Sequence, residues 1–191
     1  MADIRSERTL VALSAAIVEL ASEQALSTVT VSQIAARAGI NRATFYDHFA
    51  SPGALLASVL SPDLDAVRQR DNDLRDTGAT SSEQIFRIAL VGVAEHVERF
   101  RPIYALALPD PADNVTHHML VAHFDVSIRH RLTLLTTAAP DLNHAVASRY
   151  LAHGLVGAIE AWLEDATITR EHLVESMLLS APPWWHRQHG E

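Results

Sequence analysis

Apolar residues recur along most of this chain at the spacing of amphipathic helices. In residues 8–23, and again in residues 83–100, they fall three and four positions apart, which places them on one face of a helix. Residues 25–30 contain β-branched side chains that are compatible with a short strand. Six residues between two helical patterns are better explained as a connection, however. The pattern therefore predicts an all-α fold of about nine helices.

Capping residues and prolines place the ends of these helices. Thr30 followed by Gln33 is a capping-box pattern, and Gly39 is suited to a left-handed helix stop. Pro62 lies inside the fourth predicted helix, which we expect it to kink or interrupt. The predicted helices cover residues 8–23, 31–38, 42–48, 53–74, 83–100, 102–109, 112–138, 142–164 and 170–179.

A helix-start signal near residue 52 divides the chain into two predicted domains. Ser51-Pro52-Gly53 has a serine suited to capping and a proline suited to the first helical position. Three predicted helices precede this signal and the rest follow it. We therefore expect a small N-terminal domain at residues 1–52 and a larger helical bundle at residues 53–191.

The predicted helices at residues 31–38 and 42–48 have the layout of a helix-turn-helix. Both are short, and the tight turn between them contains Gly39. We expect a shared apolar core from Ile34, Ala35, Ala38, Phe45 and Phe49. In such motifs the N-terminal end of the second helix enters the major groove of DNA. The side chains that this helix would present outward are Arg42, Ala43, Thr44, Tyr46, Asp47 and His48.

Composition narrows the class of protein. The chain has 191 residues, of which 48% are hydrophobic and 20% charged, as in folded globular proteins. No apolar run reaches the ~18 residues of a membrane span. The first residues lack the apolar segment of a signal peptide, so we expect a cytoplasmic protein. The absence of cysteine excludes disulfides and thiolate zinc sites.

The net charge of −8 argues at first against a nucleic-acid partner. The charge is uneven, however. Residues 1–60 hold four arginines and five carboxylates, for a net −1, and the other residues carry −7. This asymmetry supports a DNA-facing N-terminus and predicts modest non-specific affinity for DNA.

Residues 30–49 read TVSQIAARAGINRATFYDHF. This stretch resembles the TetR family of bacterial regulators, with a Thr cap, an Ile-Ala pair, an Ala-Gly-hydrophobic turn and a Thr-aromatic-Tyr-x-His-Phe recognition helix. The similarity extends over about residues 8–60, and residues 154–163 weakly resemble the dimerisation helix of the family. The resemblance implies an N-terminal helix-turn-helix domain and a C-terminal domain for ligand binding and dimerisation.

The resemblance also assigns roles to the outward residues. Thr30 would contact a phosphate beside the backbone N–H of Val31, and Tyr46 and His48 would hold further phosphates. At the recognition helix, residues at three successive positions would read base edges, namely Arg42, Ala43 and Thr44. Arg42 is the candidate for a bidentate contact to guanine, with ~1–3 kcal/mol of discrimination. Asp47 would accept from cytosine N4 or tune Arg42.

Three positions depart from the family pattern. Ala25 stands where a glycine usually ends the first helix. Pro52 and Gly53 stand where the family usually has a lysine and an acidic residue. That lysine normally reaches a phosphate, so its loss removes one charged DNA contact and leaves only backbone N–H groups there.

For the C-terminal region, the resemblance implies a homodimer that binds a palindromic operator as a repressor and releases it when a small molecule binds. We expect no cofactor, no metal and no membrane partner. Apolar and aromatic positions with a few polar tips suit a small-molecule pocket: Phe86, Leu90, His96, Phe100, Tyr104, His118, Met119, Phe124 and Trp162. The predicted dimer interface comprises Tyr150, Leu151, Gly154, Leu155, Ala158, Ile159, Leu173 and Met177.

The residues allow two other functions. A helical small-molecule-binding protein with weak or lost DNA binding would fit the acidic charge and the absence of lysine at position 52. An enzyme would use Glu95 with His96, or the histidines of residues 112–130, for acid–base chemistry. Nothing pairs these groups with a nucleophile.

Two further features leave alternatives. Asp113 and His117 share a face of one predicted helix, while His118 points elsewhere and His123 follows. A metal site would need ligands from a second helix, so surface or hydrogen-bonded histidines are the simpler interpretation. The tail at residues 184–186 contains two tryptophans, which either cover a hydrophobic patch or are disordered.

Overall fold

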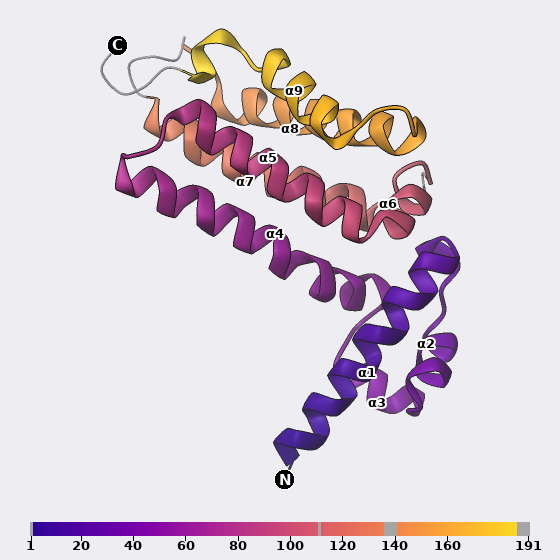
Figure 1. Ribbon diagram of the computed structural model, residues 1–191. Coiled ribbons are helices and arrows are strands. Elements are labelled where there is room, and N and C mark those ends of the chain that lie inside the picture. Colours follow the sequence, from indigo (N-terminus) through magenta and orange to yellow (C-terminus); the bar gives the residue numbers. More distant parts are fainter. Residues whose placement is uncertain (1, 111, 136–140, 187–191) are drawn as a thin grey trace. The chain divides into compact units, whose positions relative to one another are not determined.

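The computed structural model describes residues 2–110, 112–135 and 141–186 (Figure 1). Within these ranges the chain forms nine α-helices and two short 3-10 helices, and no strand, which confirms the predicted all-α fold. The α-helices are α1 (Ala2–Glu23), α2 (Val31–Ala38), α3 (Arg42–Tyr46), α4 (Pro52–Thr77), α5 (Ser82–Arg99), α6 (Arg101–Ala107), α7 (Val115–Leu134), α8 (His144–Glu164) and α9 (Arg170–Ser180). The 3-10 helices are η1 (Leu26–Thr28) and η2 (Pro183–His186). None of the described helices is long and apolar enough to cross a membrane.

The predicted caps of α2 are present. The Thr30 hydroxyl oxygen accepts the Gln33 backbone N–H at 3.3 Å, and the Gln33 side chain accepts the Thr30 backbone N–H at 2.8 Å. Gly39 ends the helix with φ 67°, a conformation that residues with a Cβ adopt only at a cost. These local contacts explain why the sequence pattern located both ends of α2 correctly.

Several helix ends differ from the predicted ones, and for two of them a side-chain cap gives the reason. α1 begins at Ala2, before the first apolar-periodic residue. α7 begins at Val115 because the Asp113 carboxylate accepts the Val115 backbone N–H at 3.1 Å. The predicted end of this helix, at residue 138, lies outside the described residues. α8 begins at His144, since the Asn143 side-chain oxygen accepts the backbone N–H groups of Ala145 and Val146.

Of the two effects predicted for Pro62, a kink or an interruption, the interruption does not occur. α4 continues through Pro62, although a proline cannot donate the hydrogen bond of a regular helical turn. The helix α3 ends at Tyr46, two residues earlier than predicted. The segment at residues 25–30 is a connection, as predicted, and contains the 3-10 turn η1.

The helices form two compact units. The N-terminal unit comprises Met1–Pro62 and Phe100–His117. In it α2 packs against α1 and α3, and α6 packs against α1 (Figure 1). Its core includes the fully buried side chains of Leu13, Ile17, Ile34, Phe45 and Tyr104. The predicted core members Ala38 and Phe49 are only half-buried.

The C-terminal unit comprises Asp63–Arg99 and His118–Glu191. In it α5 packs against α9 and against η2, and α8 packs against α9. The helix α4 contributes its first part to the N-terminal unit and its second part to the C-terminal unit. These two units are defined by how compactly the residues pack. The predicted boundary between two functional domains at residue 52 stays a prediction.

We predict that Gly39→Ala lowers the free energy of unfolding by ~1 kcal/mol, because the added Cβ opposes a positive φ. Gly39→Asn should cost less, since asparagine tolerates the left-handed region. Chemical denaturation followed by circular dichroism measures both values. Equal stability of the alanine variant and the unaltered protein would contradict the prediction.

Candidate functional site

The short helix α3 has one buried side, which carries the Phe45 ring, and one exposed side. The Phe45 side chain is 0% exposed, whereas Tyr46 beside it is 54% exposed. Arg42, Ala43 and Asp47 are also exposed. The structure thus turns outward the face that the sequence predicted for base reading.

Of the predicted DNA-contact residues at positions 42–48, Thr44 and His48 are less exposed to solvent than the others. Thr44 is half-buried, and its hydroxyl donates to the Asn41 side-chain oxygen at 3.1 Å. The same oxygen accepts the Thr44 backbone N–H at 2.8 Å, which caps α3. His48 is half-buried against Phe49, with 6.4 Å between ring centroids. Thr44 therefore has a structural role besides any contact to DNA.

The N-terminus of α2 places the two remaining predicted contacts at one end of the helix-turn-helix. Thr30 is exposed and Val31 half-buried. The Thr30 hydroxyl also donates to the Gln33 side chain at 2.7 Å. The capping contacts hold this turn in a fixed shape, so the first backbone N–H groups of α2 remain oriented as an anion site requires.

An ion-pair cluster that the sequence analysis missed joins α2 to α1. The Arg37 guanidinium lies 2.9 Å from the Glu19 carboxylate and 3.3 Å from that of Glu23. The two glutamates stand four residues apart, on one face of α1. The sequence shows this spacing of the two glutamates, but only the packing of α2 against α1 brings Arg37 to them.

Gly53 has a packing role that explains one departure from the family pattern. A Cβ at this position would come within 2.9 Å of the Val115 side chain, closer than real Cβ contacts. The start of α4 therefore approaches the start of α7 too closely for the usual acidic residue. The Ser51 hydroxyl accepts the Ala54 backbone N–H at 3.1 Å, which confirms the predicted cap.

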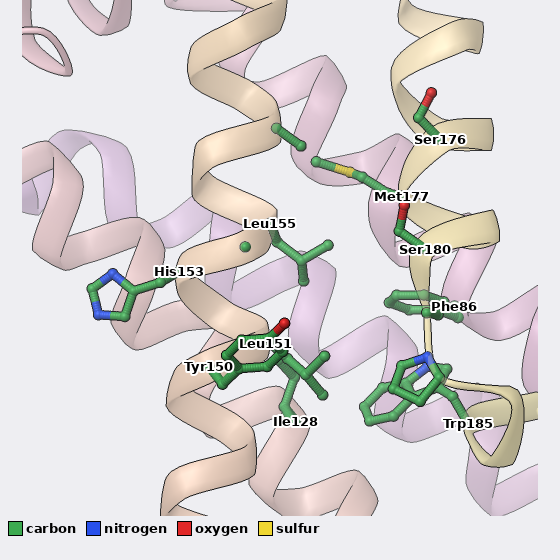
Figure 2. Close-up of a pocket in the computed structure, with 14 residues that line it drawn as sticks. Phe86, Ile128, Tyr150, Leu151, His153, Leu155, Ser176, Met177, Ser180 and Trp185 are labelled. Atoms are coloured by element: carbon green, nitrogen blue, oxygen red, sulfur yellow. The ribbon is translucent and has the colours of Figure 1, made fainter.

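The C-terminal unit has an apolar hollow between α8 and α9 (Figure 2), here called the outer groove, with a volume of about 570 Å³. Figure 2 shows Leu155 of α8 and Met177 of α9 directed toward each other across it. Six of the eight predicted dimer residues line it: Tyr150, Leu151, Gly154, Leu155, Ala158 and Met177. The other two, Ile159 and Leu173, are 1% and 3% exposed and are buried in the core of the C-terminal unit.

A second hollow, here called the inner cavity, has a volume of about 30 Å³, enough for a water-sized group. One part of its wall is apolar and includes Phe86, Leu90, Phe124 and Ile128. The other part is polar and comprises Arg68, Asp71, Arg75, His123, Ser127 and Arg131. Apolar walls with a few converging polar groups are typical of small-molecule sites.

The predicted ligand residues are not all brought together. Phe86, Leu90 and Phe124 line the inner cavity, and Phe86 also lines the outer groove. Phe100 and Tyr104 belong to the N-terminal unit. His118 is exposed and Met119 half-buried, while Trp162 is buried in the core at 2% exposure.

Burial dominates the electrostatics of the inner cavity. It lowers the pKa of His123 to about 4, so this imidazole is neutral near pH 7. Burial also lowers the pKa of Arg131 to about 10, with a smaller contribution from Arg75. Arg75 and Asp71 form a bidentate ion pair at 2.8 and 2.9 Å. The Asp71 carboxylate therefore neutralises the buried charge of Arg75.

The residues considered for acid–base chemistry lie in different environments. His96 is 1% exposed, and its Nδ1 lies 3.4 Å from the Asp63 carboxylate. Burial lowers the pKa of His96 more than Asp63 raises it. The Glu95 carboxylate is 54% exposed and lies 3.8 Å from Arg170. In the described ranges, no group of three or more His, Asp or Glu side chains is arranged to hold a metal ion.

Comparison with known proteins gives a family match for the N-terminal segment and structural matches for most of the chain. Residues 13–59 match the family model of bacterial regulatory proteins, tetR family. A comparison with curated protein sequences gives no significant match. The structural comparisons cover both units of the chain.

Three solved structures illustrate the shared fold. NalD from Pseudomonas aeruginosa, described as the secondary repressor of the MexAB-OprM multidrug efflux pump, is 21% identical with a TM-score of 0.65, over 91% of this chain and 96% of NalD. A tetR-family transcriptional regulator from Streptomyces coelicolor is 17% identical with a TM-score of 0.63, over 90% of this chain and 78% of that chain. FadR from Bacillus subtilis, solved with stearoyl-CoA, is 16% identical with a TM-score of 0.62, over 88% and 95%.

The family model and the shared fold agree with the resemblance found in residues 30–49. The model covers the helix-turn-helix, and the solved structures extend the likeness to the helices that follow. The N-terminal segment of this chain therefore belongs to the TetR family of bacterial regulatory proteins, and the chain has the all-helical fold of that family's transcriptional regulators.

Proposed function

We propose that this chain is a cytoplasmic, dimeric, sequence-specific DNA-binding transcription regulator, and that it acts as a repressor released from its operator by a small molecule. The observation that carries the proposal is the outward face of α3. Arg42, Ala43 and Tyr46 are exposed around a fully buried Phe45. In a helix-turn-helix these are the positions that meet the major groove and its phosphates.

The exposed groups of α3 divide into two kinds of contact. Arg42 has the fork of donors that matches the two acceptors of a guanine edge. The Tyr46 hydroxyl is suited to a phosphate, which carries no sequence information directly. Arg42 is therefore the residue on which base discrimination depends most.

Dimerisation follows from the way DNA is read. Two recognition helices reach successive major grooves when they lie roughly 34 Å apart, and the operator then shows the two-fold symmetry of the protein. The outer groove is the surface that we assign to the partner. It is apolar, its lining residue Tyr150 is 78% exposed, and Val146, four residues earlier on α8, is 67% exposed. Contiguous exposed apolar surface marks interaction sites.

Release by a small molecule is supported by the hollows of the C-terminal unit. Relatives of the same fold include FadR, solved with stearoyl-CoA, and NalD, described as a repressor. A ligand shifts the balance toward release only if it binds the release-competent conformation better. The α4 helix is suited to connect the two events, because its residues contribute to both compact units.

One observation favours a second function, a helical small-molecule-binding protein with weak or lost DNA binding. Pro52 and Gly53 stand at the start of α4, where the family usually supplies a lysine for a phosphate contact. Only backbone N–H groups remain there. Footprinting on the DNA that flanks its own gene separates the two functions, because protection of a palindrome at physiological salt is expected only for the regulator.

We predict that Arg42→Ala weakens binding to that operator by ~10-fold or more and relaxes base preference at one position in each half-site. Gel shifts with a set of operators that differ at single base pairs measure both effects. Arg70→Ala, at an exposed arginine of the C-terminal unit, is the matched control and should bind as the unaltered protein does. An equal loss on every sequence would identify Arg42 as a phosphate contact instead.

We predict that Tyr46→Phe lowers affinity by a few-fold on all operators alike, because a lost hydroxyl–phosphate hydrogen bond is worth ~1 kcal/mol and carries no base information. The same gel shifts at two salt concentrations test this. Unchanged affinity would show that the hydroxyl makes no contact with DNA.

We predict a dimer by light scattering at micromolar concentration, and a monomer for Tyr150→Glu, since a buried unpaired charge opposes association. Leu106→Glu, at another exposed apolar position, is the control and should remain dimeric. A monomeric unaltered protein would refute the palindrome argument.

A further inference from the structure

The chain places its own C-terminal segment at the wall of the inner cavity. Trp185 of η2 is 4% exposed, and its indole meets the Phe86 ring edge-on with 5.4 Å between centroids. The backbone carbonyl oxygen of Trp185 accepts a hydrogen bond from the Arg131 guanidinium at 3.2 Å. One residue thus offers an aromatic ring to Phe86 and an acceptor oxygen to Arg131.

The same indole separates the two hollows of the C-terminal unit. Trp185, Phe86, Ile128 and Leu155 line both the outer groove and the inner cavity. Figure 2 shows the Trp185 ring beside Phe86 at the edge of the outer groove. Moving the indole away would therefore open the inner cavity to the groove.

The polar wall of the inner cavity favours an anion. Its lining residues include the guanidinium groups of Arg68, Arg75 and Arg131, of which Arg68 pairs with Asp65 outside the lining, and a single lining carboxylate, Asp71. Both oxygens of that carboxylate already accept hydrogen bonds from Arg75. In addition, Nδ1 of His123 is buried without a hydrogen-bond partner among the described residues. A buried polar atom of this kind is costly unless another group satisfies it.

We propose that the inner cavity, enlarged by displacement of Trp185, is a binding site for an aromatic carboxylate. The ring of the ligand replaces the indole against Phe86, and its carboxylate replaces the Trp185 carbonyl oxygen on Arg131. The role of this ligand as an effector rests on the proposed function, but the binding site itself does not.

The chemistry of the two contacts selects this class. A carboxylate accepts two guanidinium N–H groups at once and adds a negative charge, whereas a backbone carbonyl is neutral. An aromatic ring keeps the edge-to-face contact with Phe86 that the indole makes now. The cavity of about 30 Å³ holds only a water-sized group, so the body of any larger ligand must take the space of Trp185.

Displacement of Trp185 would also act on the proposed dimer face. η2 follows α9 by two residues, and Ala181, Pro182 and Trp185 line the outer groove with α8 residues. A ligand that expels the indole changes the wall of the groove that the partner is proposed to cover. This arrangement connects effector binding to the spacing of the two recognition helices.

Calorimetric titration of the full chain with naphthalene-2-carboxylate tests the site, with naphthalene-2-carboxamide as the uncharged match. We expect the carboxylate to bind at least tenfold more tightly than the amide. Trp185→Ala should strengthen carboxylate binding at least tenfold, because the competing indole is gone. Leu179→Ala is the control, since this exposed residue of α9 lines neither hollow, and it should change binding less than twofold.

Equal affinity for acid and amide, or an unchanged affinity in Trp185→Ala, would overturn the proposal. A second experiment uses the protein without substitutions, so that misfolding of the Trp185→Ala variant cannot affect the result. In protein labelled with 5-fluorotryptophan, naphthalene-2-carboxylate should move the Trp185 fluorine resonance toward its solvent-exposed position and leave that of Trp162 in place. A Trp185 resonance that stays fixed at saturation would equally refute displacement.

The site and the proposed function fail in different ways. Titration without DNA tests the site alone, and footprinting without ligand tests DNA binding alone. Carboxylate binding that depends on Trp185, in a protein that protects no DNA, would retain the site and refute the regulator. Operator protection in a protein that does not bind the carboxylate would retain DNA binding and refute the site.

Discussion

The burial of one phenylalanine ring determines which face of α3 is available to DNA. A five-residue helix is too short to be stable alone in water, so its orientation depends on tertiary contacts. Phe45 supplies that contact, and the Asn41 cap fixes the first turn. Because the ring points inward, Arg42 and Tyr46 point outward. The proposed reading of DNA therefore follows from a hydrophobic contact and not from the charges themselves.

The C-terminal unit is built on a different constraint, the cost of burying guanidinium groups. Arg75 is compensated by the bidentate carboxylate of Asp71, and Arg131 donates to the Ser82 hydroxyl and to the Trp185 carbonyl oxygen. The C-terminal tryptophan thus satisfies a polar group and fills apolar space at once, and a ligand that does both better can replace it.

Local signals explain how far the fold was predictable. The capping box at Thr30 and the left-handed Gly39 involve residues a few positions apart, so the sequence pattern located α2 correctly. Pro62 does not interrupt α4, because one lost hydrogen bond is not enough to end a helix that continues on both sides. The contact between Gly53 and Val115, and the pairing of Arg37 with Glu19, join distant segments that no local pattern relates.

By itself the sequence determined the helical class, the helix-turn-helix and the outward residues of α3, because periodicity and capping act over a few residues. Only the tertiary structure decided which C-terminal side chains share a hollow. It placed Tyr104 in the N-terminal unit, divided the predicted dimer residues between the outer groove and the core, and brought Trp185 onto Phe86 and Arg131. Such contacts depend on how whole helices pack, and apolar helices of similar pattern allow many packings.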